Sequence, residues 1–73
     1  MNEKKLTLKE REKISRIGMK YFKGEIDYNN TVEMLENDFN LETIRIANSG
    51  KLYIKLVGKS AELFEYSLPV KKR

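Results

Sequence analysis

The stretch TIRIANSGKLYIKLVGKSAELFEYSL, residues 43–68, decides the fold, because apolar and polar residues alternate in it over three successive runs. Such a period of two is typical of β-strands that bury one face. Turn-forming residues separate the runs at positions 48–50 (Asn-Ser-Gly) and 58–60 (Gly-Lys-Ser). Pro69 follows the third run and is expected to end it, since proline has no N–H to donate to a sheet. The pattern therefore predicts three strands joined by short turns.

Eight apolar residues of the three runs have even numbers, so the strands place these eight on one face of the sheet. They are Ile44, Ile46, Leu52, Ile54, Leu56, Phe64, Tyr66 and Leu68. This face is expected to be buried. The opposite face is expected to carry Arg45, Tyr53, Lys55 and Leu63, with Lys51 at its edge.

A helix is predicted from about Leu8 to Lys23. Thr7 and Glu10 have the spacing of a capping box, in which each side chain accepts a hydrogen bond from the backbone of the other. Gly24 is a natural stop. One face of this helix is apolar at the spacing i, i+3, i+4, i+7, i+8. Its members are Ile14, Ile17, Gly18, Tyr21 and Phe22.

A second helix is predicted from about Tyr28 to Phe39, with Asp27 as its N-cap and Asn40 as a stop. Its core face is expected to consist of Tyr28, Val32, Leu35 and Phe39. Acidic residues dominate the segment from residue 25 to residue 42. A helix of this charge repels phosphates, so it is not the helix that we expect to approach a nucleic acid.

Residues 41–48 allow a second interpretation. A short helix there, with Gly50 past its end, would give three helices plus a β-hairpin, the order of a winged helix-turn-helix. The strand is favoured because a helix would place Ile44 and Ile46 on different sides. We therefore expect an α+β fold in which two N-terminal helices pack on a three-stranded antiparallel β-meander. Residues 1–73 form a single small domain in this interpretation, with residues 1–5 frayed and a basic tail at 69–73.

The composition excludes several kinds of site. The 73 residues include no cysteine and no histidine, which removes disulfides, thiolate nucleophiles, the commonest metal ligand and the commonest general base. We therefore expect a protein that is not an enzyme and has no cofactor or metal. Stability must come from packing or from a partner that binds the folded state, and a homodimer is one such case. Neither a signal peptide nor a membrane span is evident, which predicts a cytoplasmic protein without a membrane partner.

Charge is distributed unevenly along the chain. Residues 1–23 contain eight Lys/Arg and three Glu, residues 24–49 contain one Arg and six Asp/Glu, and residues 50–73 contain six Lys/Arg and two Glu. Two basic ends thus flank an acidic middle. This pattern is compatible with an anionic partner.

Five cations of the first predicted helix form the candidate site that we call the basic ridge. They are Lys9, Lys13, Arg16, Lys20 and Lys23. Their spacing places them in a stripe about 80° wide, opposite the apolar face. By spacing, only Glu12 can neutralise part of the ridge, through a pair with Arg16. Several cations along one line suit contacts to nucleic-acid phosphates, although a solvated helix face has the same pattern.

The outer sheet face is a second candidate. Tyr53 could stack on a base while Arg45 and Lys55 hold its phosphate. Ordinary cross-strand pairing, for example of Lys55 with Glu65, explains these residues equally well.

The leading hypothesis is a small regulatory protein that binds DNA or RNA through the basic ridge. The alternative is an inhibitor or adaptor that binds a partner protein.

Overall fold

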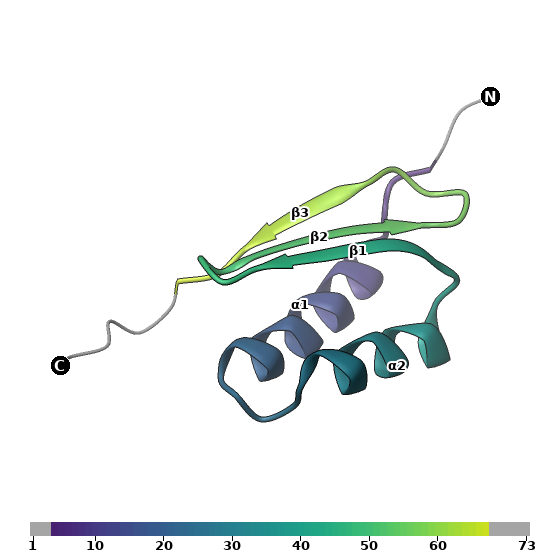
Figure 1. Cartoon of the computed structure of the whole chain (residues 1–73). Coiled ribbons are helices and arrows are strands. Elements are labelled where there is room, and N and C mark those ends of the chain that lie inside the picture. Colours follow the sequence, from purple (N-terminus) through teal and green to yellow (C-terminus); the bar gives the residue numbers. More distant parts are fainter. Residues whose placement is uncertain (1–3, 68–73) are drawn as a thin grey trace, which may run out of the picture.

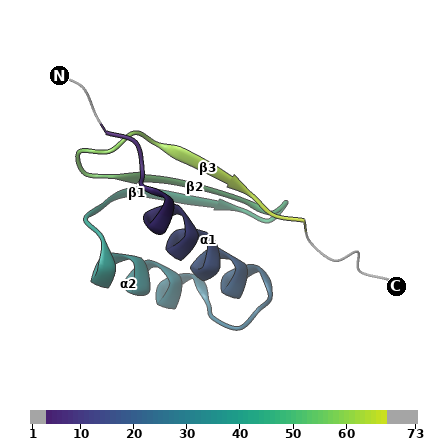
Figure 2. The same cartoon turned by 180° about the vertical axis from the view of Figure 1, so that it is seen from behind.

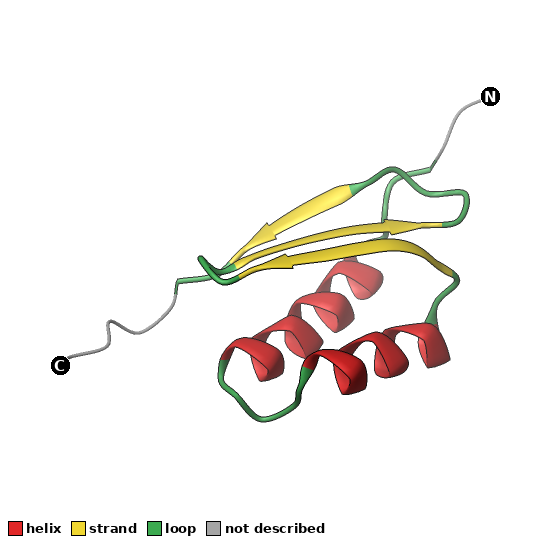
Figure 3. Cartoon of the chain, in the orientation of Figure 1, coloured by secondary structure: helices red, strands yellow, loops and turns green. Residues whose placement is uncertain are grey.

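The computed structural model describes residues 4–67, in which two helices precede a three-stranded antiparallel sheet of order β1-β2-β3. Both helices lie on the same side of the sheet (Figures 1 and 3). The predicted α+β fold is therefore confirmed, and the winged helix-turn-helix alternative is wrong because residues 41–47 form a strand. The elements are α1 (Leu8–Phe22), α2 (Tyr28–Asp38), β1 (Leu41–Ala47), β2 (Lys51–Leu56) and β3 (Glu62–Glu65).

The ends of α1 follow from local residue chemistry. The Thr7 hydroxyl accepts from the Glu10 N–H at 3.2 Å, and a Glu10 carboxylate oxygen accepts from the Thr7 N–H at 2.8 Å. This completes the predicted capping box and satisfies backbone donors that the helix itself leaves unpaired. Lys23 is the C-cap, and Gly24 then takes the left-handed conformation at φ 83°. The predicted stop is confirmed.

The strands are joined at the predicted turns. Gly50 has φ 100°, and its N–H donates to the Ala47 carbonyl at 3.0 Å. A three-residue hairpin loop with glycine at its left-handed position matches the twist of antiparallel strands. At the next turn, the Lys59 N–H donates to the Leu56 carbonyl at 3.0 Å.

The N-terminal segment is held against the second turn. Lys4 donates its N–H to the Gly58 carbonyl at 3.3 Å and accepts from the Ser60 N–H at 2.8 Å. Leu6 is buried in the core. The prediction that residues 1–5 fray is therefore wrong for Lys4. Residues 1–3 and the predicted basic tail at 69–73 lie outside the described residues.

The core lies between the helices and the even-numbered face of the sheet. Within the described residues, each predicted member of that face is buried or half-buried, and Leu68 lies outside them. The fully or nearly fully buried apolar side chains are Leu6, Ile14, Ile17, Leu35, Leu52, Ile54 and Leu56.

The core face of α2 differs from the prediction, because Met34 packs against the buried core and Val32 is not among the half-buried residues that do. Tyr28 is 45% exposed, whereas Thr31 is fully buried beside the core. Thr31 tolerates burial because its hydroxyl donates to the Asp27 carbonyl at 2.7 Å. The spacing of apolar residues alone does not reveal that a threonine can be buried, because its hydroxyl forms a hydrogen bond with a nearby backbone carbonyl.

Candidate nucleic-acid interface

All five side chains of the basic ridge are exposed. α1 packs on the sheet through Ile14, Ile17 and Gly18, which are buried on its other side. The ridge therefore faces solvent, as its spacing predicted. Since α1 rises about 1.5 Å per residue, the ridge from Lys9 to Lys23 is about 21 Å long.

Only one ridge cation is engaged in an ion pair within residues 4–67. Lys13 lies 3.2 Å from a carboxylate oxygen of Asp38 on α2. The pair of Glu12 with Arg16 suggested by spacing is not formed in this part of the chain. The remaining four cations are exposed and form no ion pair within residues 4–67. They are Lys9, Arg16, Lys20 and Lys23.

Three cations outside the ridge are paired with carboxylates from distant parts of the sequence. The pairs are Arg11–Glu62 at 3.0 Å, Lys59–Glu10 at 3.2 Å and Lys55–Glu42 at 3.3 Å. Much of the acidic charge is thus used inside the fold. The ridge is left with four exposed cations that form no ion pair within residues 4–67.

The second predicted surface lies on β1 and β2. Arg45 and Tyr53 are direct cross-strand partners, and Leu63 on β3 is opposite Tyr53 on its other side. Tyr53 is 37% exposed. Together with Thr43, Arg45 and Tyr53 line a shallow hollow of about 420 Å³. The surface offers one aromatic ring and one neighbouring guanidinium.

Lys55 is less accessible than predicted. Its side chain is 18% exposed, and its ammonium group contacts Glu42 and donates to the Leu56 carbonyl at 3.3 Å. The predicted pair of Lys55 with Glu65 is wrong, because the register of β2 and β3 places Glu65 opposite Lys51. A cation already held by a carboxylate and a carbonyl is a poor phosphate ligand.

The eight predicted site residues do not form a single site. The basic ridge lies on α1, under one side of the sheet, whereas Arg45 and Tyr53 lie on the side that neither helix covers (Figure 2). The spacing of residues in the sequence predicted the basic ridge and the outer sheet face separately. It did not predict that the body of the protein lies between these two surfaces.

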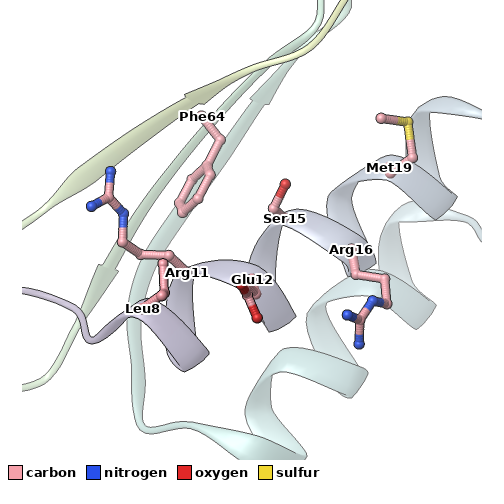
Figure 4. A pocket seen from close by; sticks show the side chains of 7 residues that line it. All are labelled: Leu8, Arg11, Glu12, Ser15, Arg16, Met19 and Phe64. Carbon is pink, nitrogen blue, oxygen red and sulfur yellow. The ribbon is translucent and has the colours of Figure 1, made fainter.

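A groove beside α1 was not predicted. It has a volume of about 650 Å³, and Phe64 of β3 extends toward α1 along it (Figure 4). Two apolar side chains of α1 are exposed there, Leu8 at 71% and Met19 at 37%. In the sequence they lie outside the predicted apolar stripe of this helix, so only their i, i+11 spacing hinted at a common face. The lining residues are Leu8, Arg11, Glu12, Ser15, Arg16, Met19 and Phe64.

Two other kinds of feature, a metal site and a membrane-spanning helix, are absent from residues 4–67. No cluster of three or more carboxylates within residues 4–67 is arranged to hold a metal ion. None of the helices in this part of the chain has the length and apolar character needed to cross a membrane. Comparisons with models of known protein families, with curated proteins and with solved structures found no match.

Proposed function

We propose that this protein binds nucleic acid through the basic ridge of α1. The observation that carries the proposal is the set of four exposed ridge cations without an ion pair within residues 4–67, on a chain whose other cations are partly paired. The ridge length of about 21 Å equals roughly six base-pair rises along the axis of a duplex. The partner is an extended polyanion rather than a small anion.

The binding is electrostatic and largely independent of base sequence. Lysine ammonium groups neutralise phosphates and release counterions, but their geometry does not distinguish bases. With four or five contacts, the logarithm of the binding constant falls against the logarithm of salt concentration with a slope of roughly −4. The exposed Glu33 and Glu36 of α2 repel phosphates and direct the polyanion along α1.

The test is a salt titration of binding to labelled duplex DNA, single-stranded DNA and RNA, followed by fluorescence anisotropy. Lys20→Glu should weaken binding several-fold and reduce the magnitude of the slope by about one. Lys51→Glu is the matched control, because Lys51 is also exposed but lies on β2, away from the ridge. Absence of binding at low salt, or equal losses in the two variants, would overturn the proposal.

A partner protein is the second candidate, and the acidic side of α2 favours it. Glu33 and Glu36 are exposed and form no ion pair within residues 4–67. They present negative charge suited to a basic protein surface. Cross-linking in cell extract, compared between the wild type and a Glu33→Lys/Glu36→Lys variant, tests this function. A protein captured only by the wild type supports it, and identical captures contradict it.

A further inference from the structure

Within residues 4–67, no strand covers the outer edge of β3. In this part of the chain β3 is hydrogen-bonded to β2 alone, and the backbone hydrogen bonds of Lys4 are to Gly58 and Ser60. The Tyr66 N–H donates to the Gly50 carbonyl of the neighbouring hairpin at 2.7 Å. Because backbone groups alternate in direction along an antiparallel strand, Leu63 and Glu65 direct their N–H and C=O groups away from β2. Such an edge is a template for another strand.

Apolar side chains flank this edge on both sides of the sheet. On the helix side, the groove exposes Leu8 and Met19 beside Phe64. On the opposite side, Leu63 is 51% exposed. A strand that joined the edge would therefore bury apolar surface above and below it, in addition to forming backbone hydrogen bonds.

The charges in the groove are self-complementary. Glu12 and Arg16 both line it, carry opposite charges and are one helical turn apart. Neither forms an ion pair within residues 4–67. In a dimer with a two-fold axis, each contact between one residue of the first copy and a different residue of the second copy also occurs with the two copies exchanged. Two copies of α1 related in this way bring Glu12 of each toward Arg16 of the other.

We propose that β3 and the groove beside it form the interface of a symmetric homodimer with a continuous six-stranded sheet. The register follows from the free backbone groups. If Leu63 of one copy pairs with Glu65 of the other, the outward N–H and C=O groups of both residues form hydrogen bonds in both copies. No other register within β3 does this. This inference goes beyond nucleic-acid binding and does not rest on it. The dimer also places two copies of α1 on one side of the sheet, with Arg16 of each ridge at the interface and the other ridge cations of both copies facing the same way.

Sedimentation equilibrium over a range of protein concentrations tests the interface. The wild type should show a reversible monomer–dimer equilibrium. Met19→Lys places a charge in the groove and should raise the dimer dissociation constant at least tenfold. Leu63→Pro removes an outward N–H without breaking a bond to β2, and should have a similar effect. Val57→Lys is the matched control, because Val57 is 59% exposed but lies outside the groove and β3, and it should leave the constant unchanged.

A charge exchange tests the orientation. E12R and R16E should each weaken the dimer through like-charge contacts, and the double variant E12R/R16E should restore it. Circular dichroism establishes that each variant is folded, and Met19→Lys suffices if Leu63→Pro does not fold. A wild type that is monomeric at every concentration overturns the proposal, as does a dimer that Met19→Lys leaves intact. The readout is mass, so the result is independent of whether nucleic acid binds.

Discussion

The phenol of Tyr66 lies directly against Gly18 of α1 and donates a hydrogen bond to the Ser15 carbonyl at 3.0 Å. A Cβ atom at position 18 would lie 2.9 Å from the Tyr66 ring carbon that bears the hydroxyl and 3.0 Å from a methyl group of Leu52. Gly18 is therefore required for space. The contact joins the residue after β3 to the middle of α1.

Gly18→Ala is expected to destabilise the protein although alanine is the better helix former. Overpacking costs about 1–3 kcal/mol, and alanine gains roughly 1 kcal/mol in helix propensity, so we expect a net loss of up to about 2 kcal/mol at this tight contact. Urea denaturation measures it. Adding Tyr66→Phe removes the hydroxyl that the new methyl group meets, so the double variant should lose less than the sum of the single losses. A Gly18→Ala variant more stable than the wild type would contradict the account.

Alkaline pH is expected to destabilise the fold through Tyr66. Burial raises the pKa of the Tyr66 phenol above its ordinary value of 10.0, because the ionised form is poorly solvated. The folded state therefore retains the proton longer than the unfolded state does. The stabilisation is fully present below pH 10 and is lost as the pH rises through the folded pKa. The free energy of unfolding, measured from neutral pH to above 10, should fall less steeply in Tyr66→Phe. Equal slopes of the free energy of unfolding against pH in the wild type and in Tyr66→Phe would rule out Tyr66 as the cause.

The sequence predicted those features of the fold that are encoded by local spacing. Alternation over residues 43–68 revealed the strands, and Thr7 with Glu10 revealed the start of α1. The close approach of Tyr66 to Gly18 was not predictable, because it joins residues 48 positions apart and depends on how the sheet lies on α1. A glycine within an apolar stripe gives no sign of what packs against it.

The ion pairs formed by cations of the candidate site could not be predicted from neighbouring residues in the sequence either. The ridge was predicted from helical spacing, but its neutralising partner is Asp38 rather than Glu12, because α2 lies beside α1. Lys55 contacts Glu42 of β1, near an irregularity in the register of β1 and β2 between Leu41 and Thr43. Alternation assigns faces, and it does not give the register of neighbouring strands.

Acidic pH is expected to weaken the start of α1 through Glu10. The Thr7 N–H that donates to this carboxylate lowers the pKa of Glu10 below its ordinary value of 4.5, and the Lys59 ammonium contributes in the same direction. The carboxylate therefore stabilises the fold above about pH 4.5, and the effect is lost as the pH falls through the lowered pKa. NMR titration should show a pKa closer to 4.5 in Lys59→Met, but still below it because the Thr7 N–H remains. An unchanged pKa in Lys59→Met would mean that the ion pair does not form in solution.

Removing the charge of Asp38 should strengthen nucleic-acid binding. Asp38 holds Lys13 at 3.2 Å, so Asp38→Asn releases a fifth ridge cation and removes a negative charge near the phosphates. The affinity should increase, and the salt slope should grow in magnitude by about one. Both side chains are substantially exposed, so the pair adds little to stability and the variant should fold normally. Glu42→Gln is the matched control, since it removes a carboxylate that contacts Lys55 on the sheet and no ridge cation. Equal gains in the two variants would show that net charge, and not the ridge, determines the affinity.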